Sequence, residues 1–337
     1  MSYPSYWRNF KGVVEKNTFR ASTLIASDGH PLTIYEAGDI DRDAVVIVSP
    51  VASPFLVMAR IAESLARRFR VISWEVRGST FLDEDCDSCC LSLERHAQDL
   101  QEILASRQVG RVHYVTWCGG AWIAYWALMC RNVPGSSVFS IAPNCLSEGE
   151  EKTPFDEFIM PLLRRAVQAD PPTLESIYKI LQGGTDNRAC KSKEEKDLYE
   201  ITDLRIESPR AIRQLAKLFF DFVALPASYG CESLGGRMTT ELFDTMCGRL
   251  PVVLVHARDD QYVNYSCSLA AVARNPRTKL ILYPEGVGGH FIPFLDYRAI
   301  CSDIENLIDS TTRITSLEQV GQEAVEPPPS ICAPAVG

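Results

Sequence analysis

Apolar and polar positions follow a repeating order over the first 145 residues. Short continuous apolar runs, typical of strands covered on both faces of a parallel sheet, lie at 44–50, 70–76, 112–117 and 137–143. Segments with apolar residues at helical spacing follow the first three runs, at 54–69, 91–108 and 121–130. The alternation predicts βαβ units that build a parallel sheet with helices on both faces.

The second half of the chain interrupts this order. Residues 146–248 contain helical and charged segments without a convincing buried strand, and we expect them to form a helical lid inserted into the core. Strand-like runs resume at 250–260 and 278–286 and precede a final helix. The predicted core therefore has two parts, residues 1–145 and residues 249–310. Ligands of such sheets bind at the carboxyl ends of the strands, where an insertion would cover them.

The two ends of the chain carry different signals. Strand-like runs at 17–27 and 31–38 flank Asp28 and Gly29, a turn pair that predicts a hairpin. Residues 311–337 lack periodicity and include three successive prolines, so we expect a disordered tail.

Composition narrows the classes of function. The 337-residue chain has a net charge of −9, which disfavours a nucleic-acid partner. No apolar run has the length of a membrane span, and the first residues do not resemble a signal peptide. Twelve scattered cysteines are then typical of reduced thiols, which predicts a cytoplasmic location. The C-x-x-C at 86–89 lacks a second ligand pair at zinc spacing, so we expect no metal and no cofactor.

The stretch YVTWCGGAW at 114–122 holds the candidate nucleophile. A strand ends at Cys118, and two glycines precede the next helix, as in the sharp turn that presents a nucleophile. Gly119 would offer its backbone N–H to a developing oxyanion, and Gly120 would let helix and strand approach closely. The N-terminus of the helix also favours a thiolate. The alternative is a structural turn in which Cys118 is a small apolar residue.

A base and an acid follow later in the chain. Among five histidines, His290 lies in a glycine-rich loop just beyond the last strand, whereas the others fall in a turn, a helix or strands. Asp259 and Asp260 directly follow a buried strand at the same edge of the sheet. Nucleophile, acid and histidine therefore each come after the end of a different strand, which indicates a catalytic triad.

These motifs resemble the α/β-hydrolase fold enzymes. The resemblance covers nearly the whole ordered chain and rests on four stretches: SWEVRGST at 73–80, TWCGGA at 116–121, VHARDDQYV at 255–263 and GGHF at 288–291. It implies a mostly parallel central sheet flanked by helices. The family's acid usually stands three residues after a glycine, whose place Ala257 takes here. The resemblance therefore implies Cys118, Asp260 and His290 as the triad.

The family also suggests the oxyanion hole and the substrate contacts. Its oxyanion loop usually reads His-Gly-x after the third strand, whereas this chain has SPVA at 49–52. The resemblance implies Gly119 and Val51 as oxyanion donors, with Ala52 as the near alternative. Pro50 has no N–H to donate. Trp117 and Ala52 are candidate substrate-binding residues, and core packing is the alternative for Trp117.

A cysteine nucleophile suggests which group is transferred. Attack of a thiolate on a thioester gives another thioester, so the acyl group stays activated. The chain is similar to thioesterase-like and acyl-transferring members that use coenzyme A or acyl carrier protein thioesters. It also resembles the G-x-C-x-G-G elbow of polyhydroxyalkanoate synthases, although Thr116 replaces their first glycine.

We expect an acyl-cysteine intermediate whose acyl group is transferred or hydrolysed. Two alternatives remain at this point. One is a simple carboxylester hydrolase that works by the same triad. The other is a catalytically inactive member of the fold that serves as a ligand receptor.

Overall fold

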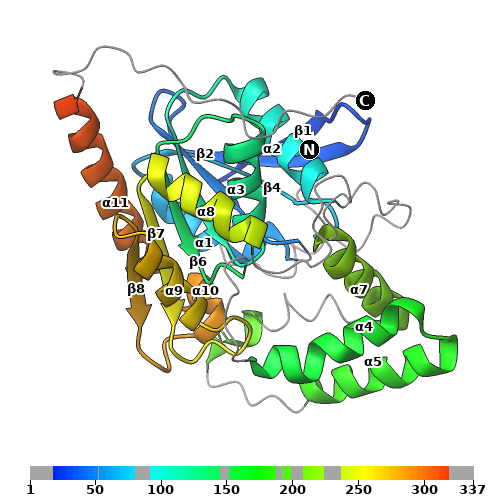
Figure 1. Ribbon diagram of the computed structural model, residues 1–337. Helices are drawn as coiled ribbons and strands as arrows, with labels where there is room; N and C mark the ends of the chain where they lie inside the picture. The colour runs from blue at the N-terminus through cyan, green and yellow to red at the C-terminus, as the bar shows by residue number, and fades with distance from the viewer. Residues whose placement is uncertain are drawn as a thin grey trace, which may run out of the picture.

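A computed structural model describes residues 18–51, 53–79, 92–144, 152–186, 192–193, 195–198, 208–223 and 237–318. Within these residues the centre is an eight-stranded sheet with strand order β1-β2-β4-β3-β5-β6-β7-β8 (Figure 1). The strands are β1 (Arg20–Ile25), β2 (Pro31–Ala37), β3 (Ala44–Val48), β4 (Arg70–Trp74), β5 (Val112–Trp117), β6 (Ser137–Ile141), β7 (Val252–Ala257) and β8 (Lys279–Tyr283).

Most of the sheet is parallel. The pairs β1–β2 and β2–β4 are antiparallel, and every other neighbouring pair runs parallel. The expected first hairpin is confirmed, since β1 pairs with β2 and the Gly29 N–H donates to the carbonyl of Ala26 at 2.8 Å. Gly29 adopts φ 88°, a left-handed conformation that favours glycine. The predicted parallel sheet is also confirmed.

Helices cover the sheet. They are η2 (Phe55–Val57), α1 (Ala59–Leu65), α2 (Leu93–Arg107), α3 (Gly120–Cys130), η4 (Phe155–Ile159), α4 (Met160–Gln168), α5 (Pro171–Asp186), α7 (Pro209–Val223), α8 (Arg237–Arg249), α9 (Ser266–Arg274), η7 (Gly289–Phe291), α10 (Ile292–Leu295) and α11 (Tyr297–Glu318). One face is covered by α2, α3 and α8, and the other by α1 and α11.

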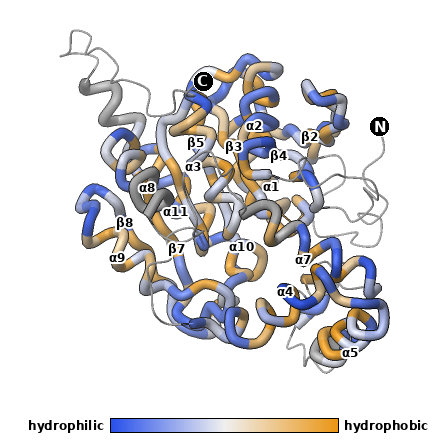
Figure 2. Tube along the Cα trace, turned by 45° about the vertical axis from the view of Figure 1, so that its right-hand side comes forward, coloured by the Kyte–Doolittle hydropathy of each residue, from blue (hydrophilic) through white to orange (hydrophobic). Residues whose placement is uncertain are grey.

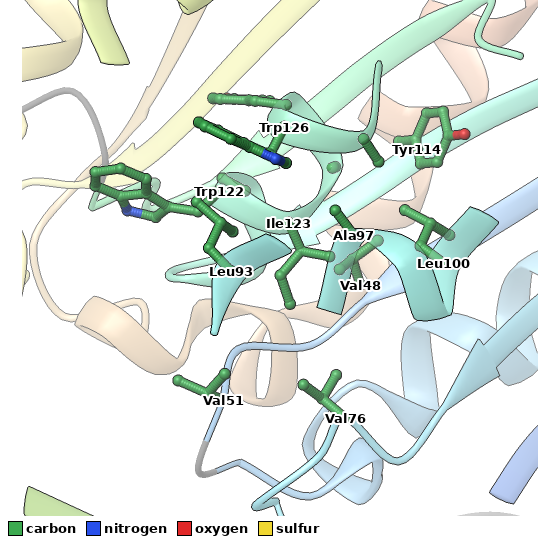
Figure 3. Packing of buried hydrophobic residues seen from close by; sticks show 14 of the residues in the cluster. Val48, Val51, Val76, Leu93, Ala97, Leu100, Tyr114, Trp122, Ile123 and Trp126 are labelled. Atoms are coloured by element: carbon green, nitrogen blue, oxygen red, sulfur yellow. The ribbon is translucent and has the colours of Figure 1, made fainter. Parts of the chain in front are cut away.

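Strand β3 shows why its apolar run is continuous. Successive side chains of a strand point to opposite faces. Val46 and Val48 join the cluster under α2 and α3, whereas Val45 and Ile47 join the cluster under α1 and α11. Figure 3 shows Val48 close to Ile123 of α3 in the first cluster. Both faces of β3 are therefore buried, and no polar position interrupts the run.

The segment between β6 and β7 has two kinds of helix. In Figure 1, α4, α5 and α7 project beyond the end of the sheet toward which β7 and β8 run. Figure 2 shows apolar and polar stretches side by side on α4 and α5. Helix α8, in contrast, packs on α3, where the rings of Phe243 and Tyr125 lie 5.6 Å apart. The helices that fit the predicted lid are thus η4, α4, α5 and α7, while α8 lies in the layer that covers the sheet.

The final helix corrects one expectation. Disorder was expected from residue 311, but α11 continues to Glu318. Thr311 is buried, and its hydroxyl donates to the carbonyl of Leu307 at 2.8 Å, one turn earlier in the helix. This bond and the burial of Ile304 and Ile308 against the sheet extend the helix past the last clear apolar repeat. The rest of the predicted tail, 319–337, lies outside the described residues.

Candidate active site

Cys118 stands in a strained turn between β5 and α3. Its φ is 48°, which for a residue with a Cβ costs about 1–3 kcal/mol and is concentrated at functional sites. The Cys118 N–H donates to the carbonyl of Ile141 on neighbouring β6 at 2.9 Å, which holds the turn. Its side chain is partly exposed. The backbone thus presents a thiol at the carboxyl edge of the sheet.

The two glycines of the turn have different tasks. A Cβ atom at Gly120 would lie 2.2 Å from the carbonyl oxygen of Val48, so only glycine fits there. The expected close approach of helix and strand is confirmed. At Gly119 a Cβ would meet Pro50 at an ordinary 3.7 Å. Gly119 therefore faces the loop after β3, where the oxyanion donors are expected.

Thr116, the unusual residue before the elbow, is fully buried. Its hydroxyl donates to Ser140 Oγ of β6 at 2.9 Å, and the Tyr125 hydroxyl donates to the same oxygen at 2.7 Å. A threonine is accommodated here because Ser140 of the neighbouring strand provides a polar partner inside the sheet.

His290 and Asp260 lie side by side. His290 Nδ1 is 2.9 Å from Asp260 Oδ2, and both side chains are almost fully buried. The other carboxylate oxygen, Oδ1, accepts from the N–H groups of Tyr262 at 2.8 Å and Val263 at 3.0 Å. The carboxylate is therefore fixed by its own turn, and it orients the imidazole by the remaining oxygen.

The charged forms of His290 and Asp260 stabilise each other. Burial opposes a charged His290, but the Asp260 carboxylate and the Cys118 sulfur outweigh it and raise the pKa of His290 well above its usual value. Burial likewise opposes a charged Asp260, yet His290 and the two backbone N–H groups lower the pKa of that carboxyl. Cys118, His290 and Asp260 thus influence one another electrostatically.

Asp259 serves a different loop. Its Oδ2 accepts from the Gly286 N–H at 2.8 Å, at the start of the glycine-rich segment that carries His290. A Cβ at Gly289 would lie 3.2 Å from the Asp259 carbonyl, so this segment runs directly against the acid turn. The adjacent aspartates thus hold the histidine loop and the histidine ring, respectively.

Trp117 is a candidate substrate contact for which core packing is the alternative. Only 2% of it is exposed, which favours packing. Its Nε1 donates to the His290 carbonyl at 3.0 Å, and its ring lies 5.4 Å from the imidazole. Trp117 therefore packs against the histidine and holds its backbone, and its side chain belongs to the buried cluster on the face of the sheet covered by α1 and α11. The other candidate contact, Ala52, lies outside the described residues.

Tyr262 joins the site to the inserted helices. Its ring stacks on His290 with centroids 4.7 Å apart, and the centroid of the Phe155 ring of η4 lies 5.0 Å from that of the Tyr262 ring. The Phe155 N–H also donates to the carbonyl of Gln261 at 3.1 Å. The first helical turn of the insertion is thus attached directly to the turn that holds Asp260.

The loop after β3 lies beside Gly119 of the elbow. In the part of the chain that the structure describes, neither the Gly119 N–H nor the Val51 N–H donates a hydrogen bond. Glu75 fixes the end of this loop, because its Oε2 accepts from the Phe55 N–H at 3.1 Å. The buried Glu75 also accepts hydrogen bonds from the hydroxyls of Tyr35 and Ser79, so it links the loop to β2 and to the turn after β4.

The described residues contain neither a cluster of metal ligands nor a membrane-spanning helix. Within the described ranges, no three His, Cys, Asp or Glu side chains come together as a metal site requires. Over the same residues, no helix combines the length and apolar character that crossing a bilayer demands.

Comparison with known proteins places the fold. The sequence matches no protein-family model and no curated protein sequence. A solved structure of a lipase candidate from Acinetobacter baumannii AYE is similar with TM-score 0.69 and 14% identity over 93% of this chain and 98% of that one. An esterase from Rhodococcus sp. ECU1013 gives TM-score 0.62 and 17% identity over 87% and 99%. For 2-hydroxy-6-oxo-6-phenylhexa-2,4-dienoate hydrolase from Rhodococcus sp. strain RHA1 the values are 0.63 and 15% over 87% and 100%. The chain has the α/β-hydrolase fold.

Sequence reasoning missed two residues at this site. Tyr262 follows the acid closely in the turn that fixes the carboxylate. Asn144 follows β6, and its side-chain amide lies next to Gly119. Both come after the end of a strand at the same edge of the sheet, which is the signal that could have found them.

Proposed function

We propose that this protein is an enzyme of the hydrolase class that forms an acyl-cysteine at Cys118. The proposed substrate is an acyl thioester carried by coenzyme A or an acyl carrier protein, and the acyl group then passes to an alcohol, an amine or water. The observation that carries the proposal is the strained φ of 48° that presents Cys118 beside the paired His290 and Asp260.

The first step forms the acyl-enzyme. The Cys118 thiolate attacks the thioester carbonyl carbon. The oxyanion that forms accepts hydrogen bonds from the backbone N–H groups of Gly119 and Val51. The bond from carbon to the carrier's sulfur then breaks, and the imidazolium of His290 gives its proton to the leaving thiolate. Asp260 stabilises the imidazolium before this transfer, which agrees with the raised pKa of His290.

The second step releases the acyl group. Neutral His290 takes a proton from the acceptor hydroxyl, amine or water as its oxygen or nitrogen attacks the acyl carbon. The bond to the Cys118 sulfur breaks, and the thiolate and imidazolium return together. The chemistry is the same for hydrolysis and transfer, so the acceptor that reaches the acyl-cysteine decides the product.

The inserted helices are proposed to control the access of water and acceptor to the acyl-cysteine. Phe155 lies against Tyr262, which stacks on His290, so the insertion begins directly over the catalytic base. We propose that η4, α4, α5 and α7 form a lid that limits water and admits the acceptor. The esterases and lipase candidate among the structural neighbours favour ester-type substrates for the class as a whole.

Intact-protein mass spectrometry tests the acyl-cysteine directly. The protein is incubated with a panel of acyl thioesters, and a mass increase of one acyl group is expected on the wild type. Cys118→Ala should show no adduct. Cys130→Ala is the matched control, because Cys130 is also partly exposed and lies at the other end of α3. An adduct that survives Cys118→Ala, or is lost in Cys130→Ala, would contradict the proposal.

Thiol labelling separates an enzyme from a binding-only member of the fold. Burial raises the pKa of Cys247, Cys267 and Cys301 to about 11, so these thiols stay protonated at neutral pH. Cys130 is the matched comparison, because it is partly exposed like Cys118. With iodoacetamide at pH 7, Cys118 should react much faster than Cys130. Equal rates at these two thiols would favour a receptor without an activated nucleophile.

A further inference from the structure

Asn144 lies at the carboxyl edge of the sheet beside the elbow. A Cβ atom at Gly119 would be 3.9 Å from both the nitrogen and the oxygen of the Asn144 side-chain amide. Because Gly119 has no side chain, nothing of its own stands between the Asn144 amide and the backbone of Gly119. Asn144 and Pro50 both lie around the place that a Gly119 side chain would take.

The orientation of this amide is fixed by Trp122 of α3. The Trp122 indole N–H donates to Asn144 Oδ1 at 3.0 Å. Because an indole can only donate, the oxygen of the amide must face Trp122. The two N–H groups of Nδ2 then point elsewhere, and they donate to no residue that the structure describes. Asn144 therefore presents a fixed hydrogen-bond donor.

Backbone strain brings Asn144 to this place. Ala142, at the end of β6, has φ 45°, and its N–H donates to the carbonyl of Val255 at 2.7 Å. A residue with a Cβ in this region is strained, as Cys118 is at the end of the neighbouring strand. Ile141 pairs with Trp117, so the two strained residues stand at the same level of the sheet. Both strand ends are bent sharply at the same edge, next to the site.

We propose that Asn144 is a specificity-determining residue whose Nδ2 donates a hydrogen bond to an oxygen on the acyl chain. The preferred acyl groups then carry an ether, hydroxyl or oxo oxygen close to the reacting carbonyl. This inference rests on the proposed acyl-cysteine function. A saturated chain would leave the amide donor without a partner, and a site built to bond a polar group discriminates against ligands that lack it.

Matched pairs of thioester probes isolate this contact. Methoxyacetyl and butyryl N-acetylcysteamine thioesters differ by one oxygen in place of one methylene, and so do 3-methoxypropanoyl and pentanoyl thioesters. The rate of Cys118 acylation is followed by mass spectrometry for each probe. The ether-to-alkyl rate ratio removes effects shared by all substrates, and comparing this ratio between variants cancels the intrinsic reactivity of the probes.

Two variants remove the donor in different ways. Asn144→Asp keeps the shape and an oxygen for the Trp122 indole, whereas Asn144→Leu removes the amide altogether. In both, the ether-to-alkyl ratio should fall by about tenfold for at least one probe pair, as expected for one lost hydrogen bond. The fall in the ratio should come from the ether probes, since the alkyl probes lack the acceptor. Trp122→Phe should give a smaller fall, because the amide is still present but free to turn.

Three results would overturn the inference. An unchanged ratio for both pairs would mean that Nδ2 contacts no acyl oxygen at either position. An equal loss with ether and alkyl probes would place the amide at the shared carbonyl group or give it a structural role. Absence of Cys118 acylation in the wild type by every probe would instead overturn the proposed function, and the inference with it.

Discussion

The carboxyl edge of the sheet and the inserted helices both contact the candidate active site, but through different kinds of interaction. At the sheet edge, backbone groups fix the chemistry: Ile141 holds the elbow, and Tyr262 and Val263 hold the acid. The helices α4, α5 and α7 pack largely on one another, and η4, which precedes them, meets the site through Phe155. A site fixed by strands would keep its geometry if the proposed lid moved, so chemistry and access could be changed separately.

The largest effect is expected when the sheet edge loses its proposed nucleophile. Cys118→Ala should abolish turnover while the fold stays intact, because a small side chain still fits the turn. Steady-state assays together with circular dichroism check both halves of this expectation. Activity above a few per cent of wild type would mean that another residue attacks the substrate.

Cys118→Ser refines this first test. A hydroxyl is less readily ionised than a thiol, and a serine ester does not keep the activation of a thioester. The variant should lose transfer to alcohols or amines more than hydrolysis. Product analysis by chromatography with both acceptors present measures the two rates, and an equal loss would point to a simple hydrolase.

The next largest effect separates the two aspartates. Asp260→Asn keeps the shape but no longer stabilises the imidazolium, so kcat should fall by roughly 10⁴-fold, or less if the thiol partly compensates. Asp259→Asn is the matched control, because an amide oxygen can still accept from the Gly286 N–H. It should change kcat little and lower the melting temperature slightly. If Asp259→Asn were the crippling change, the acid would be misassigned.

A smaller effect is expected where the two regions meet. Tyr262→Leu removes the ring between Phe155 and His290 but leaves the backbone N–H that bonds Asp260. The lid should then be held less tightly, so the ratio of hydrolysis to transfer should rise several-fold while Cys118 alkylation stays fast. Phe155→Leu, which removes only the lid's ring, should shift the ratio in the same direction. An unchanged ratio in both variants would argue that these helices do not gate the site.

The smallest effect concerns stability and pH. The raised pKa of His290 contributes stability that is complete below the unfolded histidine pKa of about 6.5 and is lost as pH rises through the folded pKa. The lowered pKa of Asp260 contributes stability that is complete above about 3.9 and is lost as pH falls through its folded pKa. The stability gap between wild type and Asp260→Asn should therefore be widest between these limits and narrow toward both extremes. Urea titrations across pH measure it, and a gap independent of pH would contradict the ion pair.

The sequence predicted most of the sheet because burial on both faces leaves an unbroken apolar run. It also located Cys118, Asp260 and His290, since each follows the end of a strand. Helical spacing was less informative: the helix expected over 54–69 is η2 followed by the short α1. Periodicity shows which face is buried but not where a 3₁₀ turn replaces an α-helix.

Contacts between distant residues could not be predicted from one sequence. Trp117 could be placed on a strand, yet nothing in its neighbours shows that its indole bonds the His290 carbonyl. Asn144 is a similar case, because its role depends on Trp122 of another element and on the strain at Ala142. Such pairings are set by the packing of whole elements and not by local pattern.

The hydrogen bond between Trp117 and His290 spans 173 positions, and this has a consequence for the newly made chain. Synthesis delivers the elbow before the strand β8 and the histidine loop that follows it. Contacts of such long sequence separation form slowly, because the entropy of loop closure opposes them. The nascent polypeptide therefore contains Cys118 before His290, and under the proposed function the thiol gains its base only when β8 docks.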